Sequence, residues 1–459
     1  MLKNLNHFRL HLLILFYLIV SAGWCVSLFV GCRSKTEKTE TDSPVAVIAG
    51  GSMAPTLVGK HYQLICPDCD FPFPVDALDK PESGDAVCPN CGFSKVTYEE
   101  SARNAPEEVR IKLGNDNIKR WDIIAFQFEE SEKKGVKRVV GLPGETIQIK
   151  DGDIWVDGKI AERSQAQKTS MMIPQFASHY SPKTIDTGSR WNLQDNPNWT
   201  IENGRFVCRA VNRDSGETET ELANGKWETA DLVYQPTYCF ASSNNRKPLD
   251  TIVDSYGYNQ NHSRQKLNPI DQIRVEFPLK LKTDCRLTFS TFCDGKNVVF
   301  EIAPKQSRAI IRADNQSVKG ELPKIEKWDN VHVAFCTMDS QPTLIINDQT
   351  VCELTLPPRK LAQRELQDNQ PEFAFAIRIS QSKTDSPLPI QADSIAVASL
   401  GPIEIFRDLY YFSDYTKEFT LGDEQFMVLG DNVPISIDSR TWSEPSIKRR
   451  QIIGTLLAD

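Results

Sequence analysis

Four cysteines in two short motifs have the spacing of metal ligands. Cys66 and Cys69 enclose Pro-Asp, Cys88 and Cys91 enclose Pro-Asn, and eighteen residues separate the two pairs. Two residues between thiolates allow a tight turn, and four such thiolates are the ligand set of a structural zinc site, with no open position for a catalytic water. The same thiols could instead form two disulfides, which an oxidising compartment favours, or remain an empty dithiol site. We expect zinc.

A second residue that could take part in a reaction is Ser52, within the segment VAVIAGGSMAPT (residues 45–56). The apolar run predicts a strand, and the two glycines at its end predict a tight turn that can present the next side chain. A serine hydroxyl is a weak nucleophile until an adjacent base removes its proton, and a lysine can serve as that base in place of a histidine. A lone serine in a glycine turn is usually structural, so other segments must support the assignment.

Four segments together resemble the type I signal peptidase family. They are GGSMAPT at 50–56, RWDIIAF at 120–126, KRVVGLPGE at 137–145 and GDNVPISIDSR at 430–440, in the order of the family. The resemblance implies a membrane-bound serine endopeptidase that removes N-terminal signal peptides from exported precursor proteins without a catalytic cofactor. It covers the N-terminal apolar segment, residues 44–60, residues 117–160, and about residue 420 to the end.

The resemblance assigns the two reacting side chains. Ser52 matches the nucleophile, and Lys137 matches the general base. A lysine can accept a proton only when neutral, so burial must lower its pKa from the usual value of about 10.4. Because alternate residues of a strand share a face, Lys137 and Arg138 are expected to point in opposite directions.

The same resemblance implies a supporting network around the pair. Ser436 matches a serine whose hydroxyl orients the lysine amine. Arg138 is expected to pair with Asp431, and Asp438 with Arg440 two residues further along one strand face. An ordinary structural salt bridge is compatible with that role.

Substrate contacts are less well defined by the sequence. Family members cut after small residues, and Met53 is expected to form part of the wall of a shallow apolar pocket. The backbone N–H of Ser52 is implied as one oxyanion donor. Gly50 stands where some family members have a hydroxyl residue, so the sequence does not identify a second donor.

The N-terminus contains an apolar segment, Leu10 to Cys32, without Asp, Glu, Lys or Arg. As a helix it is long enough to cross a hydrocarbon core of about 30 Å. Basic residues flank both sides, so the positive-inside rule does not decide its orientation. A cleavable signal peptide and a lipoprotein signal ending before Cys32 are alternatives, and both also imply export. We expect an uncleaved anchor in the lipid bilayer of the cell membrane, with the catalytic body outside the cytoplasm.

The middle of the chain has a different character. Between about residues 190 and 405, short alternating runs such as RLTFSTF and NVVFEIA predict an all-β sandwich. The strand pattern resembles lectin or laminin-G sandwiches, but it does not identify a ligand. The C-terminal segment then returns to the sequence pattern of the first β region, so we expect the sandwich to be an insertion. Its removal should leave some activity on a small peptide.

The expected fold is mainly β and contains a signal-peptidase-like catalytic core interrupted by two insertions. A chain of 459 residues predicts more than one domain. In chain order, the prediction is a cytoplasmic stub and transmembrane anchor (1–33), a linker (34–43), a first core segment with the nucleophile (44–61), a zinc-ribbon-like insertion (62–100), a second core segment with the base (101–185), the sandwich-like insertion (186–405) and a third core segment (406–459).

Charge and the remaining cysteines limit other interpretations. With 53 basic and 61 acidic residues the net charge is −8, which does not favour a nucleic-acid partner. If all were bridged, six further cysteines would allow 15 pairings; they are Cys208, Cys239, Cys285, Cys293, Cys336 and Cys352. The rival hypothesis from another functional class is an inactive exported binding protein on the same scaffold, which predicts a broken serine-lysine pair. A peptidase specialised for one substrate is a further alternative.

Overall fold

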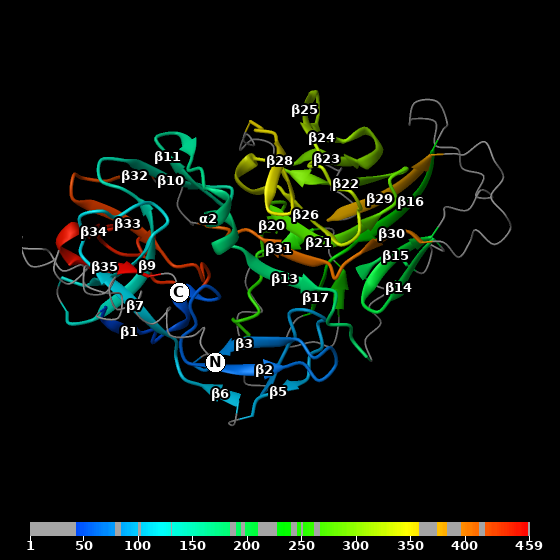
Figure 1. Cartoon of the computed structure of the whole chain (residues 1–459). Helices are drawn as coiled ribbons and strands as arrows, with labels where there is room; N and C mark the ends of the chain where they lie inside the picture. The colour runs from blue at the N-terminus through cyan, green and yellow to red at the C-terminus, as the bar shows by residue number, and fades with distance from the viewer. Residues whose placement is uncertain are drawn as a thin grey trace, which may run out of the picture. The chain divides into compact units, whose positions relative to one another are not determined.

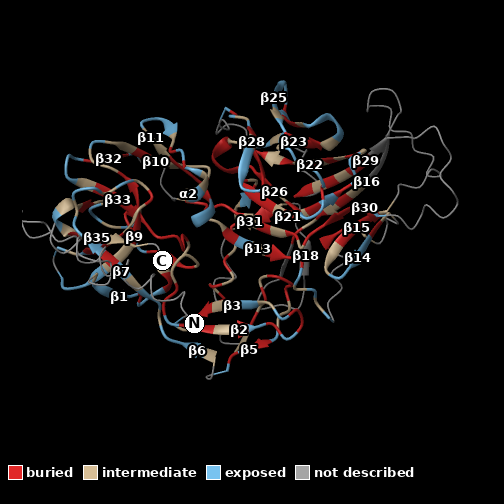
Figure 2. Cartoon of the chain, viewed as in Figure 1, coloured by how far each residue is buried: buried red, intermediate tan, exposed pale blue. Residues whose placement is uncertain are grey.

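Alternating burial along the strands follows the alternating polarity of the sequence. In β22 (Cys285–Cys293) every second side chain is buried and those between are half-buried, as the period of two in a strand requires. The computed structural model confirms a mainly β protein (Figure 2). Residues 44–459 form one compact unit. The structure describes residues 43–78, 84–99, 102–129, 131–183, 190–193, 198–209, 227–239, 246–248, 251–260, 267–357, 374–382, 396–412 and 418–457.

Segments that lie far apart in the sequence share the sheets of the predicted catalytic core. The C-terminal strand β35 pairs with β7 and β8, and β33 pairs with β9 (Figure 1). A smaller sheet joins β10 to β32. The order of the larger sheet is β1 (Val45–Val47), β7 (Glu108–Leu113), β35 (Ile452–Leu456), β8 (Ile123–Gln127), β9 (Lys134–Gly141), β33 (Gln425–Leu429) and β34 (Ile447–Lys448); that of the smaller is β12 (Lys159–Ile160), β11 (Asp153–Val156), β10 (Thr146–Lys150) and β32 (Phe419–Thr420).

Two larger sheets contain most of the strands of residues 173–407, which we call the two-sheet region. One contains nine strands: β14 (Trp199–Glu202), β15 (Arg205–Arg209), β30 (Ala396–Leu400), β21 (Ile273–Leu281), β26 (Val331–Cys336), β27 (Thr343–Ile346) and β28 (Gln349–Glu353) in order, with β13 (Ile173–Ala177) and β31 (Glu404–Arg407) beside them. The other contains β16 (Trp227–Tyr234), β29 (Phe375–Ser382), β22, β23 (Lys296–Ala303), β24 (Arg308–Ala313) and β25 (Gln316–Glu321).

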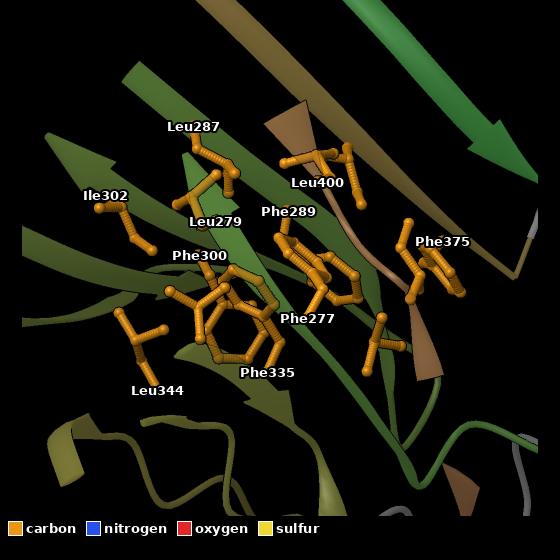
Figure 3. Packing of buried hydrophobic residues seen from close by; sticks show 14 of the residues in the cluster. Phe277, Leu279, Leu287, Phe289, Phe300, Ile302, Phe335, Leu344, Phe375 and Leu400 are labelled. Carbon is orange, nitrogen blue, oxygen red and sulfur yellow. The ribbon is translucent and has the colours of Figure 1, made fainter. Parts of the chain in front are cut away.

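Aromatic side chains from both sheets form one core in this region. Phe335 of the nine-stranded sheet stacks on Phe289 of the six-stranded sheet, with ring centroids 4.5 Å apart and planes 5° from parallel. Phe300 meets the edge of Phe335 at 5.5 Å. All three are fully buried within one hydrophobic cluster (Figure 3). Burial of such rings is the main force that holds the two sheets together.

The pairing of β13 places it in a different sheet from the one its sequence position suggests. Residues 173–177 fall in the range assigned to the catalytic core, but β13 pairs with β31 of the nine-stranded sheet. Strand β31 also crosses the expected boundary at residues 405 and 406. A strand pattern shows that a segment is extended, whereas long-range pairing decides which sheet it joins.

Small elements complete the described chain. The cysteine-containing segment has a three-stranded and a two-stranded sheet with their own buried cluster. Within the described ranges no helix has the length and apolar character needed to cross a bilayer; the expected anchor within residues 1–33 lies outside those ranges. The remaining elements are η2 (Gly51–Met53), β2 (His61–Ile65), β3 (Pro72–Asp76), β4 (Asp85–Ala86), β5 (Val96–Thr97), β6 (Arg103–Asn104), α2 (Gln165–Ser170), β17 (Thr237–Cys239), β18 (Arg246–Pro248), β19 (Ile252–Val253), β20 (Pro269–Ile270), η5 (Pro304–Gln306), η6 (Met338–Ser340) and η9 (Arg449–Gln451).

A buried ionic cluster joins the small sheet of the core to the two-sheet region. Arg163, which follows β12, donates to Asp408 Oδ1 at 2.7 Å and to Asp339 Oδ1 at 3.0 Å. All three side chains are nearly inaccessible to solvent. Asp153 lies beside them and accepts two hydrogen bonds from Gln272 Nε2. Because one guanidinium satisfies two carboxylates, the cluster is held by ion pairing.

We expect Arg163→Ala to lower the free energy of unfolding by about 3–5 kcal/mol, because two buried carboxylates then lose their main counter-charge. Denaturant unfolding of the purified chain measures this loss. The matched control is Lys280→Ala, which removes a pair with Asp329 in which both side chains are more than half exposed. That change should reduce stability by less than about 1 kcal/mol. Equal losses in the two variants would contradict a stabilising role for the buried cluster.

Candidate active site

The nucleophile candidate lies in a short helical turn that follows β1. The turn η2 comprises Gly51, Ser52 and Met53, preceded by Gly50 in an extended conformation. A Cβ added to Gly51 would lie 2.5 Å from Cε1 of Tyr258, so only glycine permits this close packing. The structure therefore has the expected strand and turn, and the glycine requirement at residue 51 comes from a tyrosine of the two-sheet region.

Lys137 projects from β9 toward this turn. Its strand lies between β8 and β33 in the seven-stranded sheet, with Lys137 opposite Ile124. The Nζ atom lies 2.6 Å from Ser52 Oγ, and the lysine is buried, with 6 % exposure. This burial lowers the pKa of Lys137 from 10.5 to about 8, against the opposing attraction of Asp438 and Asp431.

Neighbouring side chains of β9 point to opposite faces of the sheet, as the alternation along a strand predicts. Val139 packs in the cluster with Ile124, whereas Val140 packs in the cluster with Trp121. Arg138, on the same face as Val140, donates to the Trp121 carbonyl oxygen at 2.9 Å. The guanidinium is therefore directed away from the amine of the preceding lysine.

Arg138 and Asp431 form a bidentate buried ion pair. Arg138 Nε donates to Asp431 Oδ1 at 2.9 Å and an Nη donates to Oδ2 at 2.6 Å. Thr56 Oγ1 donates to the same carboxylate at 2.5 Å. The pair thus connects β9, the segment after β33 and the nucleophile segment, because Thr56 is four residues beyond Ser52.

Asp438 and Arg440 also pair, with two N–O distances of 2.8 Å. The buried Asp438 carboxylate accepts a further hydrogen bond from the Gly430 N–H at 3.0 Å. Residues 430–446 form turns and bends rather than the expected strand. The pairing therefore comes from a folded loop, not from one strand face.

Ser436 lies at the site but does not make the expected contact with the lysine amine. Its Oγ is buried and has no hydrogen-bond partner among the described atoms. A Cβ on Gly430 would lie 2.2 Å from this oxygen and 2.4 Å from the carbonyl oxygen of Ser52. The hydroxyl therefore lies close to the nucleophile turn. Met53 is also buried, with 1 % exposure, so its role as a pocket wall stays a prediction.

Asn432 holds the nucleophile turn, although the sequence assigned it no role. Its backbone N–H donates to the Ser52 carbonyl oxygen at 3.1 Å, and its side-chain amide donates to the Gly51 carbonyl oxygen at 2.9 Å. The motif GDN at 430–432 was a signal that could have indicated this residue. No comparable motif indicated Tyr256 or Asn259, two residues of the two-sheet region that form hydrogen bonds with Asp431 and Asn432.

Comparisons with known proteins match a limited share of the chain. Residues 42–215 match the family described as signal peptidase, peptidase S26. Signal peptidase I T of Bacillus subtilis is 31 % identical over 86 residues, which cover 17 % of this chain and 43 % of that protein. Signal peptidase I of Bacillus licheniformis is 29 % identical over 86 residues, covering 17 % and 45 %. The chain thus spans less than half the length of these curated relatives. The matches support the type I signal peptidase family.

Solved structures also resemble portions of the chain at low similarity. The laminarinase catalytic domain of Thermotoga maritima is 9 % identical, covers 52 % of this chain and 98 % of its own, and gives a TM-score of 0.28. A β-glucanase of Bacillus licheniformis is 8 % identical, covers 46 % and 82 %, and gives 0.27. Similarity at this level supports no inference about a ligand of the two-sheet region.

The four motif cysteines converge, as their spacing predicts. Their sulfur atoms lie within 4.8 Å of one another, with Cys66 3.6 Å from Cys91 and Cys69 3.6 Å from Cys88. A disulfide requires about 2.05 Å, and all four thiols are free. Four sulfurs at about 2.3 Å from a tetrahedral zinc would be about 3.8 Å apart. The cluster therefore fits a four-thiolate metal site.

The two halves of this cluster share one backbone pattern. The N–H groups of Cys66 and Cys88 donate to the carbonyl oxygens of Phe71 and Phe93, each five residues further along. Asp70 and Gly92 take equivalent places, each with a positive φ and with its N–H donating to the carbonyl oxygen of the first cysteine of its motif. Two equivalent turns thus direct four sulfurs to one point.

The remaining described cysteines do not form disulfides. Burial raises the pKa of the Cys208 and Cys285 thiols to about 12, which makes them unreactive. The side chain of Cys239 lies outside the described residues. The sequence left the pairing of these cysteines open, and the structure shows five of them free and buried: Cys208, Cys285, Cys293, Cys336 and Cys352.

Replacing the buried lysine should stabilise the folded chain by an amount that depends on pH. The pKa of Lys137 is about 8 in the folded chain, lower than its ordinary value of 10.5, so the unfolded chain binds the proton more tightly. Lys137→Met should therefore raise the free energy of unfolding below pH 8, by at most about 3 kcal/mol. The gain should shrink as the pH rises toward 10.5, where the wild-type amine is neutral in both states. Unfolding curves at about pH 7 and pH 10 measure this difference, and a gain independent of pH would contradict the lowered pKa.

Proposed function

We propose that this chain is a membrane-anchored serine endopeptidase that removes N-terminal signal peptides from exported precursor proteins. The observation that carries the proposal is the 2.6 Å contact between Lys137 Nζ and Ser52 Oγ, made by an amine whose burial lowers its pKa to about 8. The family match supplies the substrate class. No histidine is needed for this chemistry.

The lowered pKa makes Lys137 a usable base near neutral pH. At pH 7, a pKa of about 8 leaves about a tenth of the amine neutral, roughly 300-fold more than at the unperturbed value. In the protonated form Nζ donates to Ser52 Oγ. In the neutral form its lone pair can accept the serine proton, and the 2.6 Å separation already suits that transfer.

The reaction follows from these two positions. Ser52 Oγ forms a bond to the scissile carbonyl carbon while its proton passes to Lys137 Nζ. The N–H groups at the start of a short helical turn have no partner within the turn, so the Ser52 N–H is suited to bind the developing oxyanion. Lys137 then returns the proton to the leaving amine. A water deprotonated by Lys137 Nζ then attacks the acyl-enzyme, and the proton passes to Ser52 Oγ as the ester bond breaks.

The two ion pairs support this chemistry by balancing charge. Asp438 and Asp431 both favour the protonated form of Lys137, whereas Arg440 opposes it. Pairing each carboxylate with an arginine limits its attraction for the amine. We infer that the pairs keep the lysine pKa low as well as holding the loop in place.

The anchoring and location of the enzyme belong to the same proposal. The uncharged segment Leu10–Cys32 would anchor the chain in the cell membrane. The catalytic body would then lie outside the cytoplasm, where exported precursors emerge from the membrane. The lipid bilayer and the signal peptides of these precursors are the proposed partners.

We also propose that Cys66, Cys69, Cys88 and Cys91 bind one structural zinc in a zinc-ribbon-like insertion. The sulfur positions and the two equivalent backbone turns support this assignment. Four thiolates would complete the coordination of the metal. Zinc would stabilise the local fold, and no catalytic step requires it.

The inactive binding protein is the weaker hypothesis. It predicts loss of the serine-lysine pair, yet both side chains are present and in contact. Burying a lysine amine without a chemical role would reduce stability for no gain. A specialised peptidase differs from a general one only in its substrates, which a panel of exported precursors would separate.

Lys137→Arg should reduce precursor cleavage nearly as much as Lys137→Ala, by about 10⁴-fold or more, because guanidinium cannot accept the Ser52 proton. Ser52→Ala should cause a similar loss. Wild-type kcat/KM should rise with pH through about 8, the lowered pKa of Lys137. A precursor with an Ala-x-Ala site serves as substrate.

Lys134→Arg is the matched control, since this residue begins the same strand and is exposed. Its activity should equal that of the wild type. Substantial cleavage by a folded Lys137→Arg enzyme would show that Ser52 uses another base.

Elemental analysis of the purified chain should find about one zinc per molecule, and Cys66→Ala should reduce this content because one of four ligands is lost. Cys208→Ala, which removes a buried thiol outside the cluster, should leave the metal content unchanged. Absence of metal together with bridged motif cysteines in mass spectrometry would support the disulfide alternative.

A further inference from the structure

We propose that Asn259, supplied by the two-sheet region, is a positioning residue for the nucleophile. It acts through Asn432, whose amide it holds in the orientation that anchors the Ser52 turn. The inference rests on the proposed peptidase function but concerns a residue outside the segments that resemble the family. It also gives the two-sheet region a direct role in the catalytic site.

Asn432 holds the nucleophile turn through two hydrogen bonds. Its backbone N–H and its side-chain Nδ2 donate to the carbonyl oxygens of Ser52 and Gly51, at 3.1 and 2.9 Å. These two carbonyl groups belong to the nucleophile and the residue before it. Their positions help to fix the backbone from which Ser52 Oγ reaches Lys137 Nζ.

The side-chain amides of Asn259 and Asn432 pair reciprocally. Asn259 Nδ2 donates to Asn432 Oδ1 at 2.6 Å, and Asn432 Nδ2 donates to Asn259 Oδ1 at 2.8 Å. The two N–H groups of Asn432 Nδ2 are thus both used, one by Asn259 and one by Gly51. A flipped Asn432 amide would direct its oxygen at two other oxygens. The Gly51 carbonyl oxygen can only accept, so it requires the donating orientation of Asn432, and the paired Asn259 amide holds Asn432 in that orientation.

Hydrogen bonds on both sides of Asn259 anchor the segment that carries it. The Tyr256 hydroxyl donates to the Asp431 carbonyl oxygen at 2.9 Å. Gln260 exchanges two hydrogen bonds with the backbone of Val87, next to the cysteine cluster, at 2.8 and 3.1 Å. Residues on both sides of Asn259 are therefore attached to other regions of the chain, which limits its movement.

This arrangement changes the expectation for removal of the insertion. The sequence predicted that a core without residues 190–405 keeps some activity on a small peptide. Such a deletion would also remove Tyr256, Tyr258 and Asn259, all of which contact the catalytic segments. We now expect the shortened chain to have a poorly positioned nucleophile.

The test compares Asn259→Ala and Asn259→Asp with the wild-type full chain on one precursor peptide. Displacement of a nucleophile affects the reacting atoms more than substrate binding, so kcat should fall about 10- to 100-fold, and KM should change by less than about threefold. Asn259→Asp should be at least as damaging, because a carboxylate would face Asn432 Oδ1 without a donor. Wild-type kcat in both variants would overturn the proposal.

A double-mutant cycle tests whether Asn259 acts through Asn432. If it does, Asn259→Ala combined with Asn432→Ala should lower kcat to within about twofold of Asn432→Ala alone. Multiplicative losses would show independent action and overturn the proposed route. Asn192→Ala is the matched control, because among the described residues the hydrogen bonds of this amide are to the backbone of β16 within the two-sheet region. Asn192→Ala should leave kcat unchanged. If it lowers kcat as much as Asn259→Ala does, the loss in both variants comes from general destabilisation, and the proposal is overturned.

A second readout separates this inference from the proposed function. The rate at which an activated acyl ester modifies Ser52, followed by mass spectrometry of the intact chain, depends on the nucleophile but not on signal-peptide recognition. Asn259→Ala should slow acylation about 10- to 100-fold relative to the wild type, with Ser52→Ala as background. If the wild type is acylated but cuts no precursor, the proposed function fails while the acylation ratio still decides the role of Asn259. Acylation of wild type no faster than that of Ser52→Ala would overturn both.

Discussion

A lysine amine buried against a serine hydroxyl is the constraint on which the described site depends. Moving an ammonium group out of water is unfavourable, and the lowered pKa of Lys137 is the direct expression of that penalty. The penalty is also what makes the amine useful, since a lysine in water would hold its proton at neutral pH. The central position of β9, between β8 and β33, provides the burial. The stability given up at this residue is thus linked to the chemistry proposed for it.

The charges near the amine must be arranged so that they do not cancel this effect. Two buried carboxylates lie close enough to favour the ammonium form, yet each is paired with an arginine through two hydrogen bonds. Alternation along β9 directs Lys137 and Arg138 to opposite faces, so the cation that neutralises Asp431 does not crowd the base. Asp438 is neutralised by Arg440 from the same loop. Each pair leaves its carboxylate satisfied and reduces its attraction for the amine.

The site is assembled from segments that are distant in the chain. Eighty-five positions separate Ser52 from Lys137, 293 separate Arg138 from Asp431, and 173 separate Asn259 from Asn432. The core sheets bring the first two pairs together, because strands from before and after the two-sheet region complete them. The buried cluster around Arg163 and the segment around Asn259 attach the two-sheet region to the core. Sequence patterns could suggest an insertion but could not show that it contacts the nucleophile turn.

What the sequence determined by itself was local. Alternating polarity predicted strands, glycines predicted the turn before Ser52, and the spacing of four cysteines predicted their convergence, because each depends on neighbours along the chain. Resemblance added the reacting residues and the two ion pairs. Tertiary structure alone decided that β13 joins the nine-stranded sheet, that residues 430–446 form turns, that five buried cysteines stay free, and that Asn259 meets Asn432. The physical reason is that pairing, burial and pKa depend on groups brought together by the whole fold, and a single sequence records which groups exist but not which of them meet.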